Sequence, residues 1–260
     1  MSTPLVDYDV LPGPADAPAV VLSNSLGSTR HMWDRNIELW QRHLTVVRYD
    51  TRGHGDSAVV PGPATIDDLA DDVIALLDHL GLERVHLVGL SLGGMTGMRL
   101  AAREPARIDR LVTLCTSPYL GPAANWLDRA ALVRSTGTSA VAEAVVDRWY
   151  SPGFLAREHE RVARARQMVA ATPPEGYAAS CEAIATMDLR DQLSSITAPT
   201  LAIAGADDPA TGPAHLQAIA ESVVDGSLLV VPDAAHLAND EQPETIGDAV
   251  LAHLLGAPPE

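Results

Sequence analysis

The pentapeptide Gly89-Leu90-Ser91-Leu92-Gly93 places a serine between two flanking glycines. It follows the apolar run 85–88 and precedes a helical stretch over 93–104. A tight turn from strand to helix needs small residues on both flanks, because larger side chains would clash there. Such a turn holds the hydroxyl above the edge of a sheet, beside helix amides that stabilise negative charge. We therefore expect Ser91 to be a nucleophile; the alternative is a chance Gly-Ser-Gly loop.

A serine nucleophile needs a base to accept its proton and a carboxylate to orient that base. Among the nine histidines, His236 follows the apolar run 227–231 and a short turn, late in the chain. His54 also follows an apolar run, in a glycine-rich turn near the same expected edge. The other seven lie inside elements, at the wrong end of a strand or away from any strand. Its late position makes His236 the predicted base.

Two aspartates, Asp207 and Asp208, follow the apolar run 200–204, where the orienting acid belongs. Their positions alone leave both open, because either one can instead cap a turn. The segment Asn24-Ser25-Leu26-Gly27 follows another run, 19–23. We expect a backbone amide of this loop to bind a developing oxyanion together with the amide of Leu92.

Short apolar runs alternate with helical patterns along most of the chain, which indicates an α/β fold with a parallel sheet covered on both faces. Clear helices are expected over 66–80, with acidic residues early and Gly81 after it, and over 243–255. The expected strands are 5–10, 19–23, 44–49, 85–88, 108–114, 200–204 and 227–231.

The segment 118–191 interrupts this alternation, because it contains four helical patterns and no strand pattern. Its arginines and acidic residues nearly balance, so most of the net charge of −16 belongs to the remainder. We predict a helical cap at 118–191, inserted into a core made of 1–117 and 192–260.

The composition of the 260 residues excludes several classes of protein. A net charge of −16 repels phosphate backbones, so we expect no nucleic-acid partner. All 18 basic residues are arginine, which excludes the lysine of a phosphate-binding loop or a Schiff base. The two cysteines, Cys115 and Cys181, form no zinc-binding pattern, and we expect no metal and no cofactor. Without a leader sequence or an apolar run of about 20 residues, we expect a cytoplasmic protein away from membranes.

Taken together, these residues resemble the α/β-hydrolase superfamily over essentially the whole chain. The segment 50–57, Asp-Thr-Arg-Gly-His-Gly-Asp-Ser, is similar to that superfamily's Asp-x-Arg-Gly-His-Gly-x-Ser loop. Its Gly-x-x-Asp pattern aligns the acid with Asp208, 28 residues before His236. The resemblance implies a mostly parallel eight-stranded sheet, helices on both faces and a catalytic triad of Ser91, Asp208 and His236. It also implies an oxyanion hole at Leu26 and Leu92.

Asn24-Ser25 stands where most relatives have His-Gly, and Asn-Ser-Leu-Gly resembles the 3-oxoadipate enol-lactonase branch. The segment 205–213 and the cap stretches 125–129 and 148–150 are similar to that branch too. This resemblance implies a lactonase of the β-ketoadipate pathway of aromatic catabolism. Its partner would be a small anionic lactone, and the sequence also allows a homo-oligomer. An arginine fork suits a carboxylate, so we predict substrate contacts from Trp126, Arg129 and Arg134.

Other functions fit the same residues. A carboxylesterase, a cofactor-free perhydrolase or a C–C bond hydrolase would use the same fold and triad. A non-catalytic binding protein with a hydrolase fold is a different class, and such a protein usually has a damaged triad or serine turn. Both are intact in this sequence, which favours an enzyme.

Overall fold

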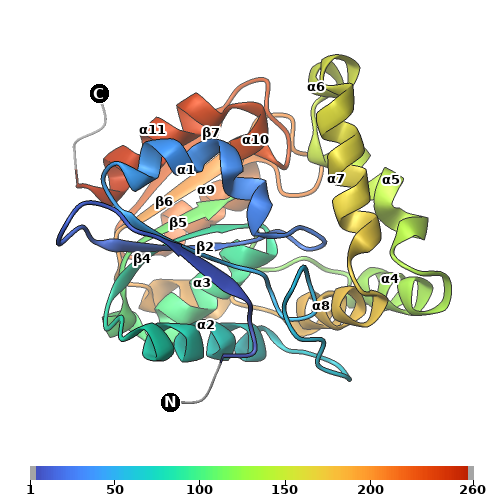
Figure 1. The fold of residues 1–260 in the computed structure, drawn as a ribbon, viewed down its shortest axis with the longest axis horizontal. Helices are drawn as coiled ribbons and strands as arrows, with labels where there is room; N and C mark the ends of the chain where they lie inside the picture. The colour runs from blue at the N-terminus through green and yellow to red at the C-terminus, as the bar shows by residue number, and fades with distance from the viewer. Residues whose placement is uncertain (1–3, 257–260) are drawn as a thin grey trace.

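The structure, a computed structural model, describes residues 4–256. A seven-stranded sheet forms the centre, in the order β1-β3-β2-β4-β5-β6-β7 (Figure 1). Strand β1 runs antiparallel to β3, and all other neighbours are parallel. The strands are β1 Tyr8–Leu11, β2 Ala19–Ser23, β3 Thr45–Tyr49, β4 Val85–Leu90, β5 Ile108–Leu114, β6 Thr200–Gly205 and β7 Gly226–Val231.

The burial of the strands matches their apolar sequences, except at the edge of the sheet. Every residue of β2, β4 and β6 is buried, as continuous apolar runs require when helices cover both faces of a parallel sheet. The edge strand β7 exposes most of its residues, although its sequence is apolar. The α/β-hydrolase architecture and each strand position expected from the apolar runs are confirmed, with ends shifted by a few residues.

The expected number of eight strands is wrong for residues 4–256, which contain seven. A single antiparallel strand, β1, precedes β2 at this edge. The connection between them contains Pro12, Pro14 and Pro18. Proline has no N–H to donate to a neighbouring strand, so this connection stays a loop.

Helices α1 and α11 contact each other on one face of the sheet, and α2 and α3 pack together on the other (Figure 1). Helix α2 shows why these elements end where they do: Thr65 and Asp68 form a reciprocal capping box, and Gly81 ends the helix with a φ of 68°. The helices around the sheet are α1 Asp34–Gln41, α2 Ile66–Leu80, α3 Leu92–Arg103, α9 Pro213–Ser222, α10 Ala238–Glu241 and α11 Pro243–Leu254, with 3₁₀ turns η1 Arg30–Trp33, η2 Pro105–Arg107 and η3 Arg190–Ser195.

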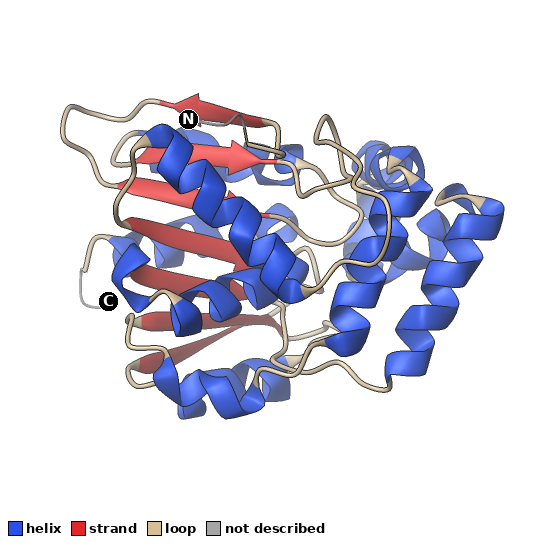
Figure 2. Ribbon diagram, turned by 90° about the horizontal axis from the view of Figure 1, so that it is seen from below, coloured by secondary structure: helices blue, strands red, loops and turns tan. Residues whose placement is uncertain are grey.

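Five helices lie between β5 and β6, and Figure 2 shows them grouped beyond the ends to which the parallel strands point. We call them the cap helices; α4 packs on α8, and α5 on α7. We propose residues 118–191 as the cap and the remainder as the core. The cap helices are α4 Ala123–Thr136, α5 Ser139–Trp149, α6 Pro152–Arg157, α7 His159–Ala171 and α8 Pro174–Thr186. Among residues 4–256, no helix has the length and hydropathy to span a membrane.

Candidate active site

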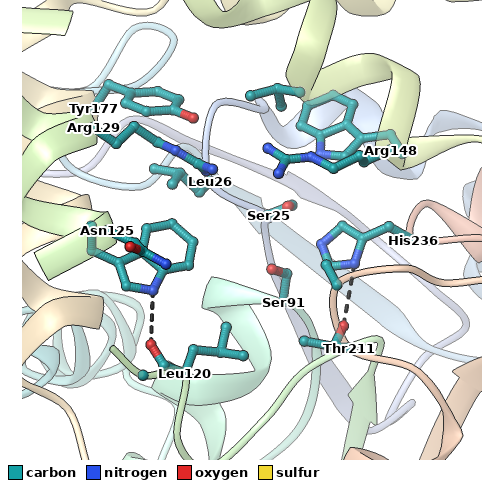
Figure 3. A pocket seen from close by; sticks show the side chains of 15 residues that line it. Ser25, Leu26, Ser91, Leu120, Asn125, Arg129, Arg148, Tyr177, Thr211 and His236 are labelled. Atoms are coloured by element: carbon teal, nitrogen blue, oxygen red, sulfur yellow. Dashed lines mark hydrogen bonds between the residues drawn. The ribbon is translucent and has the colours of Figure 1, made fainter. Parts of the chain in front are cut away.

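A cavity of about 230 Å³ lies between the cap helices and the carboxyl ends of the central strands. Ser91 and His236 line it from the core, and α4, α5 and α8 line it from the cap (Figure 3). The topology explains this meeting point, because parallel strands direct the loops that follow them to one edge of the sheet.

Ser91 occupies the turn between β4 and α3 in a strained backbone conformation, with φ 56° and ψ −115°. A Cβ on Gly93 would lie 2.1 Å from the carbonyl oxygen of Ser23, and one on Gly89 would lie 2.2 Å from that of Gly93. The two glycines are therefore required by backbone packing. The Ser91 N–H donates to the Leu114 carbonyl at 2.9 Å, which fixes the turn to β5. Strain of this kind persists where the surrounding structure enforces it.

His236 and Asp208 form a buried pair, with 2.8 Å between His236 Nδ1 and Asp208 Oδ2. Because a carboxylate can only accept, Nδ1 carries the proton and donates it to Asp208. The other ring nitrogen, Nε2, is then free to accept a proton. Both His236 and Ser91 line the cavity, but no hydrogen bond joins them in the described structure. Catalytic hydrogen bonds are often long before substrate binds.

The choice between the two aspartates follows from burial and hydrogen bonding. Asp207 is exposed, whereas Asp208 is buried and accepts from the N–H groups of Ala210 and Thr211 and from the Thr211 hydroxyl. The Thr211 hydroxyl also lies 3.3 Å from His236 Nδ1 (Figure 3). Only Asp208 is positioned to orient the imidazole.

Electrostatics favour the ionised form of Asp208. Burial by itself would raise the pKa of this carboxyl. The His236 charge and hydrogen bond, with those from Ala210 and Thr211, outweigh burial and hold the pKa well below its usual range. Asp208 is therefore a carboxylate at neutral pH, able to stabilise an imidazolium.

Leu26 and Leu92 contribute two backbone N–H groups beside Ser91. Leu92 is the first residue of α3, and its N–H belongs to the unsatisfied first turn of the helix. Neither N–H has a hydrogen-bond acceptor within residues 4–256. Both are therefore available to an oxyanion formed at Ser91.

Two buried side chains hold the loop that carries Leu26. Asn24 donates to the Tyr49 carbonyl at 2.6 Å and accepts from the Trp33 indole at 2.9 Å. His54 accepts from the Gly27 N–H at 3.1 Å and contacts the Arg52 carbonyl through Nδ1 at 3.2 Å. Burial lowers the pKa of His54 to about 4, so the ring is neutral. His54 therefore supports this loop, and of these two histidines His236 is the one that lines the cavity with Ser91.

The cap residues predicted to contact substrate separate into two groups. Trp126 and Arg129 line the cavity, and the Arg129 guanidinium lies 4.8 Å from the centre of the Trp126 ring. Arg134, on the same helix, lies outside the lining and pairs with Glu175 and Glu182. The structure therefore does not support Arg134 as a substrate contact, because acidic residues of α8 already occupy its guanidinium.

Three acidic side chains, Asp7, Asp50 and Asp56, come close enough together to suggest a cation site among the described residues. The Arg30 guanidinium contacts all three. An arginine thus balances this cluster, and the cluster lies outside the lining of the cavity.

A family model described as "alpha/beta hydrolase fold" matches residues 18–243. The chain belongs to this family. A relative named 3-oxoadipate enol-lactonase 2, from Acinetobacter baylyi, is 43% identical over 92% of this chain and 90% of its own.

Two solved structures agree with this assignment. A hydrolase from Pseudomonas aeruginosa PA01 superposes with a TM-score of 0.93 at 45% identity, covering 97% of this chain and 94% of its own. The enol-lactonase from Burkholderia xenovorans LB400 gives a TM-score of 0.93 at 38% identity, covering 96% of each chain.

Within this α/β-hydrolase site, the sequence analysis missed Arg148 and Tyr177 as lining residues. Arg148 comes from the end of α5, and Tyr177 comes from the start of α8. In the sequence, the stretch 148–150 carries only a resemblance to the enol-lactonase branch and no assigned role. The helical spacing of Val141, Val145 and Trp149 gives this segment one apolar side, and Arg148 lies at the edge of that side.

Proposed function

We propose that this α/β-hydrolase opens 3-oxoadipate enol-lactone to 3-oxoadipate through an acyl-serine intermediate. One observation carries the proposal. His236, paired with the buried Asp208, lines a cavity together with the strained Ser91, in a chain 43% identical to a 3-oxoadipate enol-lactonase.

In the first half of the reaction, the Ser91 hydroxyl attacks the lactone carbonyl and His236 Nε2 accepts its proton. The oxyanion is held by the N–H groups of Leu26 and Leu92. Collapse of this intermediate breaks the ring C–O bond, and the leaving enolate oxygen takes the proton from His236. The enol then isomerises to the ketone, while the acyl group stays on Ser91.

In the second half, His236 accepts a proton from water as the water oxygen attacks the acyl-serine carbonyl. The same amides bind the second oxyanion, and its collapse returns the proton to Ser91. One water molecule is consumed, and the product carries a new carboxylate. Asp208 stays ionised throughout and stabilises the imidazolium in both halves.

The test is a steady-state assay of the purified protein, in which the ultraviolet absorbance of the enol-lactone disappears. We expect rapid turnover by the wild type and none by Ser91→Ala, whose thermal melting should resemble that of the wild type. Turnover near the wild-type rate in Ser91→Ala would refute the serine mechanism.

The alternatives give different results on a wider panel. A carboxylesterase or perhydrolase would prefer p-nitrophenyl esters to the enol-lactone, and a C–C bond hydrolase would prefer ring-cleavage products. A binding protein would resist labelling by a fluorophosphonate probe. We expect labelling at Ser91 and the largest kcat/KM for the enol-lactone.

A further inference from the structure

Among the described residues, two arginines on the cap side of the cavity have no acidic partner. Arg129 from α4 and Arg148 from α5 extend toward one another above Ser25 and Ser91 (Figure 3). Neither forms an ion pair within residues 4–256. Among the other cap arginines, Arg134 pairs with Glu175 and Glu182, Arg161 with Asp240, and Arg166 with Asp147. Arg157 of α6 has no ion pair among the described residues either, but it lies outside the lining of the cavity.

Arg129 is half-buried and Arg148 reaches solvent, and no carboxylate among residues 4–256 forms an ion pair with either. Protein around Arg148 desolvates its guanidinium and lowers the pKa, and the positive charge of Arg129 lowers it further. The Arg129 guanidinium lies over the Trp126 ring, 4.8 Å from its centroid, as a cation–π contact. Its N–H groups then remain available to a ligand. A carboxylate between the two arginines would remove their repulsion.

Tyr177 adds an independent observation. Its side chain is fully buried, and its hydroxyl forms no hydrogen bond of normal geometry in the part of the chain that the structure describes, although the Arg129 guanidinium is close enough to lower its pKa. The hydroxyl lies beside Arg129 at the wall of the cavity (Figure 3). Burial raises its pKa to about 12, so it keeps its proton as a donor. Buried polar groups in proteins are normally hydrogen-bonded, and a ligand in the cavity would provide the acceptor for this hydroxyl.

Tyr177 also connects this wall to the oxyanion loop. A Cβ on Gly27 would lie 2.9 Å from the Tyr177 ring, so the ring packs directly on the loop that carries Leu26. A ligand held by Tyr177 and Arg129 is thereby placed at a fixed position relative to the oxyanion site.

We propose that Arg129, Arg148 and Tyr177 form a carboxylate-binding subsite that selects anionic lactones and places their ring carbonyl over Ser91. The proposal rests on the proposed lactonase function. The two guanidinium groups neutralise the substrate carboxylate, and the tyrosine hydroxyl donates a third hydrogen bond. Neutral esters and lactones gain nothing from these groups.

The test uses two lactones that differ only in charge. α-Angelica lactone has the same enol-lactone ring, with a methyl group in place of the carboxymethyl group of 3-oxoadipate enol-lactone. For Arg129→Met and Arg148→Met, we expect kcat/KM for the anionic lactone to fall on the order of tenfold to a hundredfold, mainly through KM. Tyr177→Phe should lose several-fold. All three should hydrolyse α-angelica lactone within about twofold of the wild type.

Arg134→Met is the matched control, because Arg134 lies on α4 beyond the cavity lining and is already paired. It should leave kcat/KM unchanged for both lactones. Equal losses on both lactones in the Arg129 and Arg148 variants would overturn the subsite, and so would no loss on either.

A binding experiment separates failure of the subsite from failure of the lactonase proposal. Calorimetric titration of Ser91→Ala with adipate, a dicarboxylate without a reactive ring, needs no turnover. We expect saturable binding that weakens at least tenfold when Arg148→Met is added and is unchanged when Arg134→Met is added. Adipate binding without enol-lactone turnover would reject the lactonase and keep the subsite. Turnover in the wild type with adipate binding unaffected by Arg148→Met would reject the subsite alone.

Discussion

At the scale of single residues, the hydrogen bonds around Asp208 decide which acid works with His236. We expect Asp208→Asn to lower kcat by about 10³–10⁴, because an amide can donate to Nδ1 and favour the wrong imidazole tautomer. Asp207→Asn should retain nearly full kcat, since Asp207 is exposed and does not contact the imidazole. Steady-state rates with the enol-lactone compare the two variants, and the reverse order would assign the triad acid to Asp207.

Residue types alone predicted Ser91 and His236, because the serine turn and the late histidine each depend on local sequence. They left Asp207 and Asp208 open, since two adjacent acids follow the same strand and only backbone geometry determines which one turns inward. The two cap arginines on α4 show a similar limit. Arg129 and Arg134 lie five positions apart on one helix, and the local sequence does not distinguish them. The acidic residues that pair with Arg134 lie 41 and 48 positions away along the chain.

His54 gives a prediction about pH. Its pKa is lowered from 6.5 to about 4, so between these pH values the imidazole is protonated in the unfolded chain and neutral in the folded chain. The contribution of His54 to the free energy of unfolding is therefore greatest above pH 6.5. It decreases by about 3 kcal/mol as the pH falls to 4. His54→Gln, whose side chain can still accept from the Gly27 N–H, lacks this loss. Urea unfolding between pH 7 and 4 should show the wild type losing about 3 kcal/mol more than the variant; parallel curves would contradict this.

At the scale of elements, the serine turn depends on close backbone packing. In Gly93→Ala, the new Cβ would lie 2.1 Å from the Ser23 carbonyl oxygen, which belongs to a buried strand and cannot move away. We expect a loss of several kcal/mol in the free energy of unfolding, or no folded protein. Chemical denaturation measures the effect. Gly153→Ala is the control: in α6, a Cβ there meets only the flexible end of Arg157, and stability should stay the same or rise by up to about 1 kcal/mol.

The local sequence predicted the buried strands from their apolar runs and the helix ends from their capping residues. The strands β2, β4 and β6 are apolar on both faces, and α2 has its acidic first turn and its terminal glycine. The eighth strand was expected from the family resemblance and from no apolar run of its own. Within residues 4–256, β1 is the edge of the sheet and no further strand pairs with it.

At the scale of the whole molecule, cap and core meet through a network of hydrogen bonds that the sequence does not reveal. Glu241 of α10 accepts from the Ser151 N–H and hydroxyl in the cap and from the Ala235 N–H, next to His236. Asp240 accepts from Tyr150 and Arg161 of the cap. Apart from the bond to Ala235, these hydrogen bonds join positions about 80–90 residues apart. No local sequence pattern can therefore predict them. The network fixes the segment that carries Arg148 to the loop that carries His236.

This connection leads to a prediction for Glu241→Ala. The variant leaves the N–H groups of Ser151 and Ala235 and the Ser151 hydroxyl without their acceptor. Burial raises the pKa of Glu241 despite these bonds, so removing the carboxylate also relieves some unfavourable desolvation. We expect a net loss of about 2 kcal/mol in stability. Because both the His236 loop and the Arg148 segment lose their support, kcat/KM should fall for the anionic and the neutral lactone alike.

That outcome differs from Arg148→Met, which should affect the anionic lactone only. Glu244→Ala, at an exposed position three residues along the chain in the first turn of α11, serves as the control; it should stay within about 1 kcal/mol of the wild type in stability and match it in both activities. If Glu241→Ala lowered stability and left both values of kcat/KM intact, the contact would hold the cap in place without positioning the site. If it impaired only the anionic lactone, the link to His236 would be wrong, and Glu241 would act through the cap segment alone.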